Sequence, residues 1–182
     1  MQCPKITIDG ETYMFINNNW VDSTYLLVGS NVMTKIIKEW IKGIDAVPYE
    51  DVFEFAKKLK GTGYSLQALQ LLDWLIANRE KAGNKNTVLH TLSPMKTSCL
   101  RQLKNPVGAI EFYYDITRED PGQRENAALL VSVAAAYCDA DDYEKGLLFA
   151  RKACRAVGNG FPQELSNVIA RVKKALGNDC FG

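Results

Sequence analysis

The single histidine and one of the cysteines are the residues that could pair as a base and a nucleophile. His90 and Cys99 stand nine residues apart, which on one straight helix is about 13 Å of axial rise and places the two side chains on different sides. A catalytic thiol needs its base within hydrogen-bond reach. We therefore expect no such pair, unless Pro94 breaks the helix sharply between them.

Motifs for other catalytic chemistry are missing from the sequence. It contains no G-x-S-x-G nucleophile elbow, no phosphate-binding loop and no glycine-rich nucleotide fingerprint. Acidic residues are plentiful, but no pair of them stands in an apolar setting that would mark a tuned acid and base. We therefore predict a protein that is not an enzyme and that uses no cofactor.

Metal sites are also not expected. The acidic residues Asp139 and Asp141 resemble the start of a calcium loop, but Glu144 and Ala150 stand where that loop needs glycine and glutamate. Asp142 is instead predicted to cap a helix that begins at Tyr143. The cysteines have no C-x-x-C spacing that would suit zinc and are odd in number, which indicates reduced, mostly buried thiols. They are Cys3, Cys99, Cys138, Cys154 and Cys180.

The overall composition indicates a globular, cytoplasmic protein. The chain has 182 residues, 47% of them hydrophobic, and balances 22 Lys and Arg against 21 Asp and Glu. Net charge therefore gives no reason to expect bulk attraction to nucleic acid or acidic lipid. The first residues do not read as a signal peptide. The longest apolar stretch, residues 127–138, is too short to span about 30 Å of hydrocarbon.

The N-terminal residues predict a small β element followed by one helix. Asp9-Gly10 between apolar runs is a hairpin signal, because both residues tolerate positive φ. An amphipathic helix is expected from Asn31 to Gly43. Trp20 follows a polar asparagine run and looks exposed, which makes it our loop candidate for an interface hot spot.

Helical hairpins are predicted from Tyr49 onward. In residues 130–153 one helix carries Leu130, Val133, Ala134 and Tyr137, and the next carries small residues at Gly146, Ala150 and Ala153. This pattern resembles the tetratricopeptide (TPR) repeat. The segments 49–60 and 65–80 match the same pattern, whereas in 87–103 and 106–118 only the second helix does. Asn105 and Pro106 suit a helix start.

We therefore predict an all-α fold, an α-α solenoid of about three TPR-like helical hairpins plus a capping helix, with a small N-terminal β-hairpin element. The capping helix is expected at residues 162–176, ending at Gly177. The expected domains are residues 1–48, the β-hairpin and a bridging helix, and residues 49–182, the repeat domain with its cap. TPR-like folds bind proteins, so the resemblance implies an adaptor or regulatory subunit.

The resemblance also implies where a peptide or helix would bind, because TPR proteins use a concave groove lined by the first helix of each pair. Transferred by position, this groove includes Ser98, Gln102 and Cys138, and the predicted partner-binding residues are Phe53, Lys57, Lys60, Met95, Arg101, Val131 and Ala135. Trp20 joins them as the separate loop candidate. The charged donors of a chaperone carboxylate clamp are mostly missing from these positions.

One predicted helix, residues 127–138, is apolar or small on every side. A helix that is apolar all round is buried all round. Its groove side must therefore be covered by this chain's own N-terminal region and final helix, by a second copy, or by a foreign partner. The sequence leaves these three possibilities open. If the chain does not cover this face itself, the expected partner is a foreign protein or another copy of this chain.

Nucleic-acid binding is the alternative function, and the charge balance argues against it. It would use a basic face within residues 151–174, made of Arg151, Lys152, Arg155, Arg171, Lys173 and Lys174. At spacings of three and four residues such a face is usually solvated.

Overall fold

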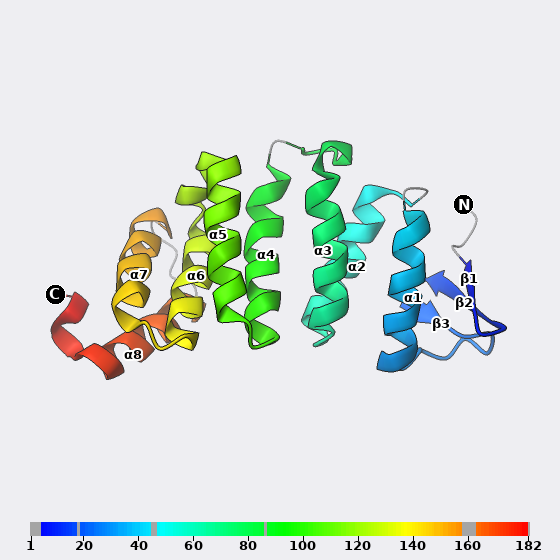
Figure 1. Cartoon of the computed structure of the whole chain (residues 1–182), viewed down its shortest axis with the longest axis horizontal. Helices are drawn as coiled ribbons and strands as arrows, with labels where there is room; N and C mark the ends of the chain where they lie inside the picture. Colours follow the sequence, from blue (N-terminus) through cyan, green and yellow to red (C-terminus); the bar gives the residue numbers. More distant parts are fainter. Residues whose placement is uncertain (1–4, 18, 45–46, 86, 158–162, 182) are drawn as a thin grey trace. The chain divides into compact units, whose positions relative to one another are not determined.

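The computed structural model describes residues 5–17, 19–44, 47–85, 87–157 and 163–181. In this part of the chain the structure is mostly helical, with eight α-helices and one small antiparallel sheet (Figure 1). Contacts divide the chain into two compact units, residues 1–85 and 86–182. Cys3 lies outside the described residues, and no disulfide joins the described cysteines.

The sheet of the first unit has the order β1-β2-β3, with β1 at Lys5–Ile8, β2 at Glu11–Ile16 and β3 at Asn19–Val21. The predicted hairpin turn is confirmed, because Asp9 and Gly10 both have positive φ and Ile8 pairs with Glu11. In the second antiparallel pair Phe15 stands opposite Trp20. Both side chains are buried, so one face of the sheet forms core.

Three helices complete the first unit: α1 at Ser30–Gly43, α2 at Tyr49–Gly61 and α3 at Ser65–Ala77. A short 3₁₀ turn, η2, follows at Arg79–Lys81. An aromatic cluster joins sheet and helices, since Phe15 contacts Trp20, Trp40 and Phe55 at ring distances of 4.9 to 5.4 Å. Because Phe55 belongs to α2, the domain boundary that we expected after residue 48 falls inside this unit.

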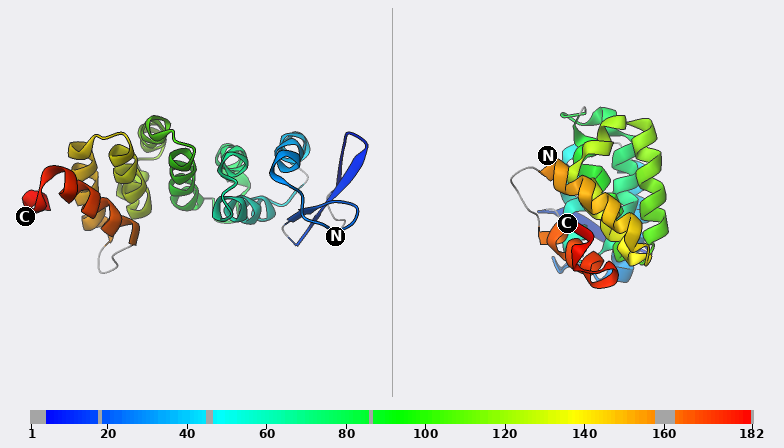
Figure 2. Two further views of the ribbon diagram at one scale, coloured as in Figure 1. Left: turned by 90° about the horizontal axis from the view of Figure 1, so that it is seen from below. Right: turned by 90° about the vertical axis from the view of Figure 1, so that its left-hand side faces the viewer.

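The second unit contains α4 at Val88–Gln102, α5 at Pro106–Glu119, α6 at Ala127–Asp139, α7 at Tyr143–Val157 and α8 at Gln163–Leu176. Short 3₁₀ turns lie at Pro121–Glu125 (η3) and Asn178–Phe181 (η4). The helices α4 to α7 run side by side, and α8 packs on α6 and α7 (Figure 2).

The predicted helix ends of this unit agree with the structure. The side chain of Asn105 accepts from the N–H of Gly108, and Asp142 accepts from the N–H of Lys145. Gly177, with φ of 99°, follows the end of α8. Pro94 does not divide its helix, since α4 continues through it.

The central helix of the second unit is α6, which packs against α4, α5, α7 and α8. Its residues from Leu129 to Cys138 are all buried. The final helix α8 contributes buried Leu165, Val168 and Val172 to this unit. The apolar helix is therefore covered by helices of its own unit, and the final helix α8, which the sequence analysis named together with the N-terminal region, is one of them.

Candidate functional site

Two of the predicted groove residues are part of the core. Val131 is 2% exposed and Ala135 is 1% exposed. A partner could reach them only if a neighbouring helix moved, because α6 is enclosed by four helices of its own unit. These two residues therefore lie on a covered face, as the apolar character of their helix predicted, and they are not accessible as partner-binding residues.

Three further predicted residues lie on α2 in the first unit. Phe53 and Lys60 are half-buried, and Lys57 is exposed and pairs with Glu54 at 3.4 Å. In the second unit Met95 is half-buried on α4. The structure brings none of these four side chains into a described pocket.

Trp20 is not an exposed hot spot, because its side chain is 0% exposed within the aromatic cluster. The exposed apolar side chains of this region come a few residues later, at Tyr25, Leu26 and Leu27, which are 66 to 71% exposed. The carboxylate of Asp22 accepts from the backbone N–H groups of Thr24 and Leu26 and so orders their loop. Sequence reasoning missed this segment because its apolar run also suits a strand.

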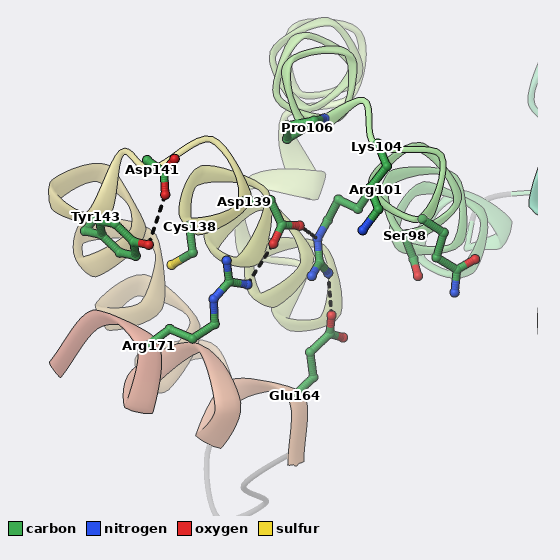
Figure 3. A pocket seen from close by; sticks show the side chains of 11 residues that line it. Ser98, Arg101, Lys104, Pro106, Cys138, Asp139, Asp141, Tyr143, Glu164 and Arg171 are labelled. Atoms are coloured by element: carbon green, nitrogen blue, oxygen red, sulfur yellow. Dashed lines mark hydrogen bonds and ion pairs between the residues drawn. The ribbon is translucent and has the colours of Figure 1, made fainter. Parts of the chain in front are cut away.

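A pocket surrounds the remaining predicted residue, Arg101. We call it the Arg101 pocket; its volume is about 610 Å³ (Figure 3). Four of its lining residues, Ser98, Arg101, Gln102 and Cys138, stand at positions where the repeat resemblance places a groove. The others are Lys104, Pro106, Asp139, Asp141, Tyr143, Glu164 and Arg171.

A chain of ion pairs runs through the Arg101 pocket. Nε of Arg101 donates to Oδ2 of Asp139 at 2.8 Å, and Nη1 of Arg101 donates to Oε1 of Glu164 at 2.6 Å. Nη1 of Arg171 donates to Oδ1 of Asp139 at 2.7 Å. Figure 3 shows both guanidinium groups directed at Asp139. The network therefore connects α4, α6 and α8.

Helix geometry explains how these side chains meet. Glu164 and Arg171 are seven residues apart on α8, which is about two turns, so both face the same side. Asp139 is the last residue of α6, and Arg101 lies in the last turn of α4. The pocket thus forms where two helices end and a third crosses them.

The charges that line the Arg101 pocket are balanced. Arg101, Arg171 and Lys104 line it together with the carboxylates of Asp139, Asp141 and Glu164, and the Arg101 side chain, at 17% exposed, is more deeply placed than that of Arg171, at 39%. Tyr143 donates to Asp141 at 3.1 Å at the opposite rim. Because acids and bases alternate here, the pocket suits a ligand that carries both donors and acceptors.

Cys138 contributes a neutral thiol to the wall of the pocket. Burial raises its pKa, against the opposing effect of Arg171. A thiol held neutral is a weak nucleophile. The side chain is 1% exposed, and its role in the pocket is to form part of the wall.

The residues first weighed for catalysis and metal binding lie apart from each other. His90 is exposed and Cys99 is buried in the same helix. The acidic segment is engaged in other roles, with Asp139 in the ion chain and Asp142 as a helix cap. Within the described ranges, no group of three potential ligands could hold a metal ion. No helix there is long and apolar enough to cross a membrane.

Sequence reasoning found Arg101 but missed its partners Asp139 and Glu164. The acidic hinge was visible, yet its contact with α4 depends on how α4 and α6 pack. The spacing of Glu164 and Arg171 was the available signal, since it predicts two opposite charges on one helix face. Compared with known proteins, the chain matches no protein-family model, no curated protein and no solved structure.

Proposed function

We propose that this chain is a protein-interaction module, an adaptor or regulatory subunit, whose second unit binds a segment of a partner protein in the Arg101 pocket. The observation that carries the proposal is the position of the pocket. It lies on the first helices of two successive hairpins, α4 and α6, at residues that the repeat resemblance assigns to a binding groove.

The proposed architecture is a solenoid of TPR-like hairpins closed by α8. Its support is local: α2 packs on α3, α4 on α5 and α6 on α7. Within the last hairpin, Gly146 lies where any larger side chain would press on Cys138, which is the close helix contact that the repeat pattern requires.

Binding would proceed by exchange of ion pairs. The guanidinium of Arg101 presents several N–H donors in a planar fork, which matches a carboxylate. Glu164 is 48% exposed, so a carboxylate of the partner can take its place on Arg101. Donors of the same segment can then meet Asp141 at the rim. The pocket therefore selects a segment of mixed charge.

The proposed binding surface is a polar pocket, in place of the apolar groove that the sequence predicted. The chain is proposed to act in the cytoplasm, without catalysis and without a cofactor, on a protein partner or on another copy of itself. No specific observation favours the nucleic-acid alternative. Two of its cations already bind the chain's own acceptors, since Arg171 contacts Asp139 and Arg151 donates to the carbonyl of Cys180 at 2.6 Å.

In the experiment, displayed random peptides are selected for binding to the whole protein, and the affinity of each selected peptide is then measured. Lys104→Glu changes the pocket charge without touching the ion chain, and Lys174→Glu on α8 is the matched control, because both side chains are exposed. We expect selected peptides of mixed charge whose affinity falls about tenfold with Lys104→Glu and not with the control. Equal affinity for both variants would place binding elsewhere.

A further inference from the structure

A second pocket lies between α5 and α7 and shares no described lining residue with the Arg101 pocket. We call it the α5–α7 pocket; its volume is about 490 Å³. It is lined by aromatic and apolar side chains from both helices, together with Arg124 from η3. It needs a separate explanation, because the proposed function does not use it.

The floor of the α5–α7 pocket is a fixed aromatic cluster. Tyr113 and Phe149 are 5% and 3% exposed, and their rings meet edge to face at 5.1 Å. Phe149 also stacks on Tyr137 at 5.2 Å, and the hydroxyl of Tyr137 lies 2.9 Å from that of Tyr114. A floor held by such contacts is formed before any ligand arrives, which lowers the entropic cost of binding.

Two large apolar side chains remain open to solvent at this pocket. Tyr114 is 47% exposed and Leu148 is 50% exposed. Tyrosine supplies a wide contact area at a low cost in conformational entropy, because only two side-chain torsions must be fixed. An exposed aromatic and an exposed leucine on one hollow are the kind of surface that anchors a partner's apolar side chain.

The rim of the α5–α7 pocket is cationic. Arg118, Arg124 and Lys152 line it, and among the described residues that line it there is no carboxylate. Arg118 pairs with Asp115 at 3.3 Å, but both side chains are more than two thirds exposed. Such a surface pair contributes little and exchanges readily for another carboxylate. The hollow therefore has an unbalanced positive rim over an apolar floor.

We infer that the α5–α7 pocket binds an acidic protein segment that carries one leucine or aromatic side chain. The apolar side chain would lie on Tyr114 and Leu148, and flanking carboxylates would meet Arg118, Arg124 and Lys152. The complementarity of charge selects an anionic partner. A peptide fits better than single-stranded nucleic acid, because Leu148 offers no stacking surface and the chain carries a net charge of only +1.

The test uses a fluorescein-labelled synthetic peptide in which leucine and phenylalanine are flanked on both sides by aspartate and glutamate. Fluorescence anisotropy measures its binding to the whole protein. The double variant Arg124→Glu/Lys152→Glu reverses two rim charges on exposed side chains. Lys104→Glu and Lys174→Glu are the matched controls, and thermal unfolding confirms that each variant is folded.

We expect saturable binding that weakens at least about tenfold in the double variant and is unchanged in both controls. Replacing the leucine and phenylalanine of the probe by alanine should weaken binding by a similar factor. Absence of saturable binding up to millimolar protein would overturn the inference. So would equal binding of the alanine probe, or a short oligothymidylate that competes with equal strength. Loss of binding with Lys104→Glu alone would show that the probe binds in the Arg101 pocket, which would also overturn the inference.

Discussion

At the scale of single residues, the contact between α6 and α7 depends on Gly146. A Cβ atom added there would lie 2.9 Å from Sγ of Cys138 and 3.6 Å from a methyl group of Val172. Cys138 is 1% exposed, so its sulfur has little room to move. The small residue of the repeat pattern is therefore required by packing, even though glycine inside a helix costs about 1 kcal/mol relative to alanine.

We predict that Gly146→Ala lowers the free energy of unfolding by about 1 to 2 kcal/mol, because overpacking outweighs the gain in helix propensity. Gly61→Ala in α2 is the matched control, since an added Cβ there meets no atom within 4 Å. Urea denaturation measures both. Adding Cys138→Ala to Gly146→Ala should show a favourable coupling energy. If Gly146→Ala stabilised the protein as much as the control, the close contact would be refuted.

Tyr49 links α2 and α3 through its hydroxyl, which donates to the carbonyl of Leu75 at 2.9 Å. Burial, followed by the nearby charge of Glu50, raises the pKa of Tyr49 to about 12. A raised pKa in the folded state means that the neutral phenol is favoured by folding. The stability it supplies is complete below the unfolded-state pKa of 10.0 and is lost as pH rises toward 12.

We predict that Tyr49→Phe costs about 1 kcal/mol at pH 7, because one buried hydrogen bond is lost. Between pH 10 and 12 the wild type should lose of order 2 kcal/mol more than the variant. Denaturation across this pH range, followed through Trp fluorescence, makes the comparison. Parallel alkaline losses in the two proteins would show that Tyr49 is not the titrating group.

At the scale of elements, α8 is held by both apolar contacts and charge. Its own side chains Leu165, Val168 and Val172 are buried against the rest of the unit. The carboxylate of Asp139 accepts from Arg101 and Arg171 and so joins α8 to α6 and α4. Loss of that carboxylate leaves two guanidinium groups facing each other without their shared acceptor.

We predict that Asp139→Asn lowers stability by about 1 to 2 kcal/mol and speeds amide exchange across α8. Glu39→Gln is the control. It breaks an exposed pair with Lys42 on α1. This loss should change the free energy of unfolding by less than about 0.5 kcal/mol. Hydrogen-exchange mass spectrometry measures the amide-exchange rate of α8 directly. An α8 that exchanges at the same rate in the two variants would argue against the ion chain as its tether.

The elements were more predictable than the site. Local signals fixed the helix starts at Asn105 and Asp142 and the turn at Asp9-Gly10, because each depends on residues a few positions apart. The sequence left open a break at Pro94, and α4 continues through this residue. The ion chain joins residues as far apart as Arg101 and Glu164, and no local pattern encodes such a contact.

At the scale of the whole molecule, the chain contains two units with separate cores. The aromatic cluster of Phe15, Trp20, Trp40 and Phe55 belongs to the first, and α6 with its neighbours forms the second. We predict that residues 86–182 fold alone, because α6 is buried by helices of the same unit. Circular dichroism and the dispersion of amide signals in NMR spectra show whether this fragment is folded. An unfolded fragment would show that the second core needs the first unit.

Binding at the Arg101 pocket is tested most directly by NMR chemical-shift mapping on the whole protein with a peptide obtained by selection. The predicted shifts cluster at the lining residues from the ends of α4 and α6 and from α8, and reaching them takes about tenfold more peptide in Lys104→Glu but not in Lys174→Glu. Shifts confined to other surfaces, or unchanged by Lys104→Glu, would contradict a protein-interaction role for this pocket.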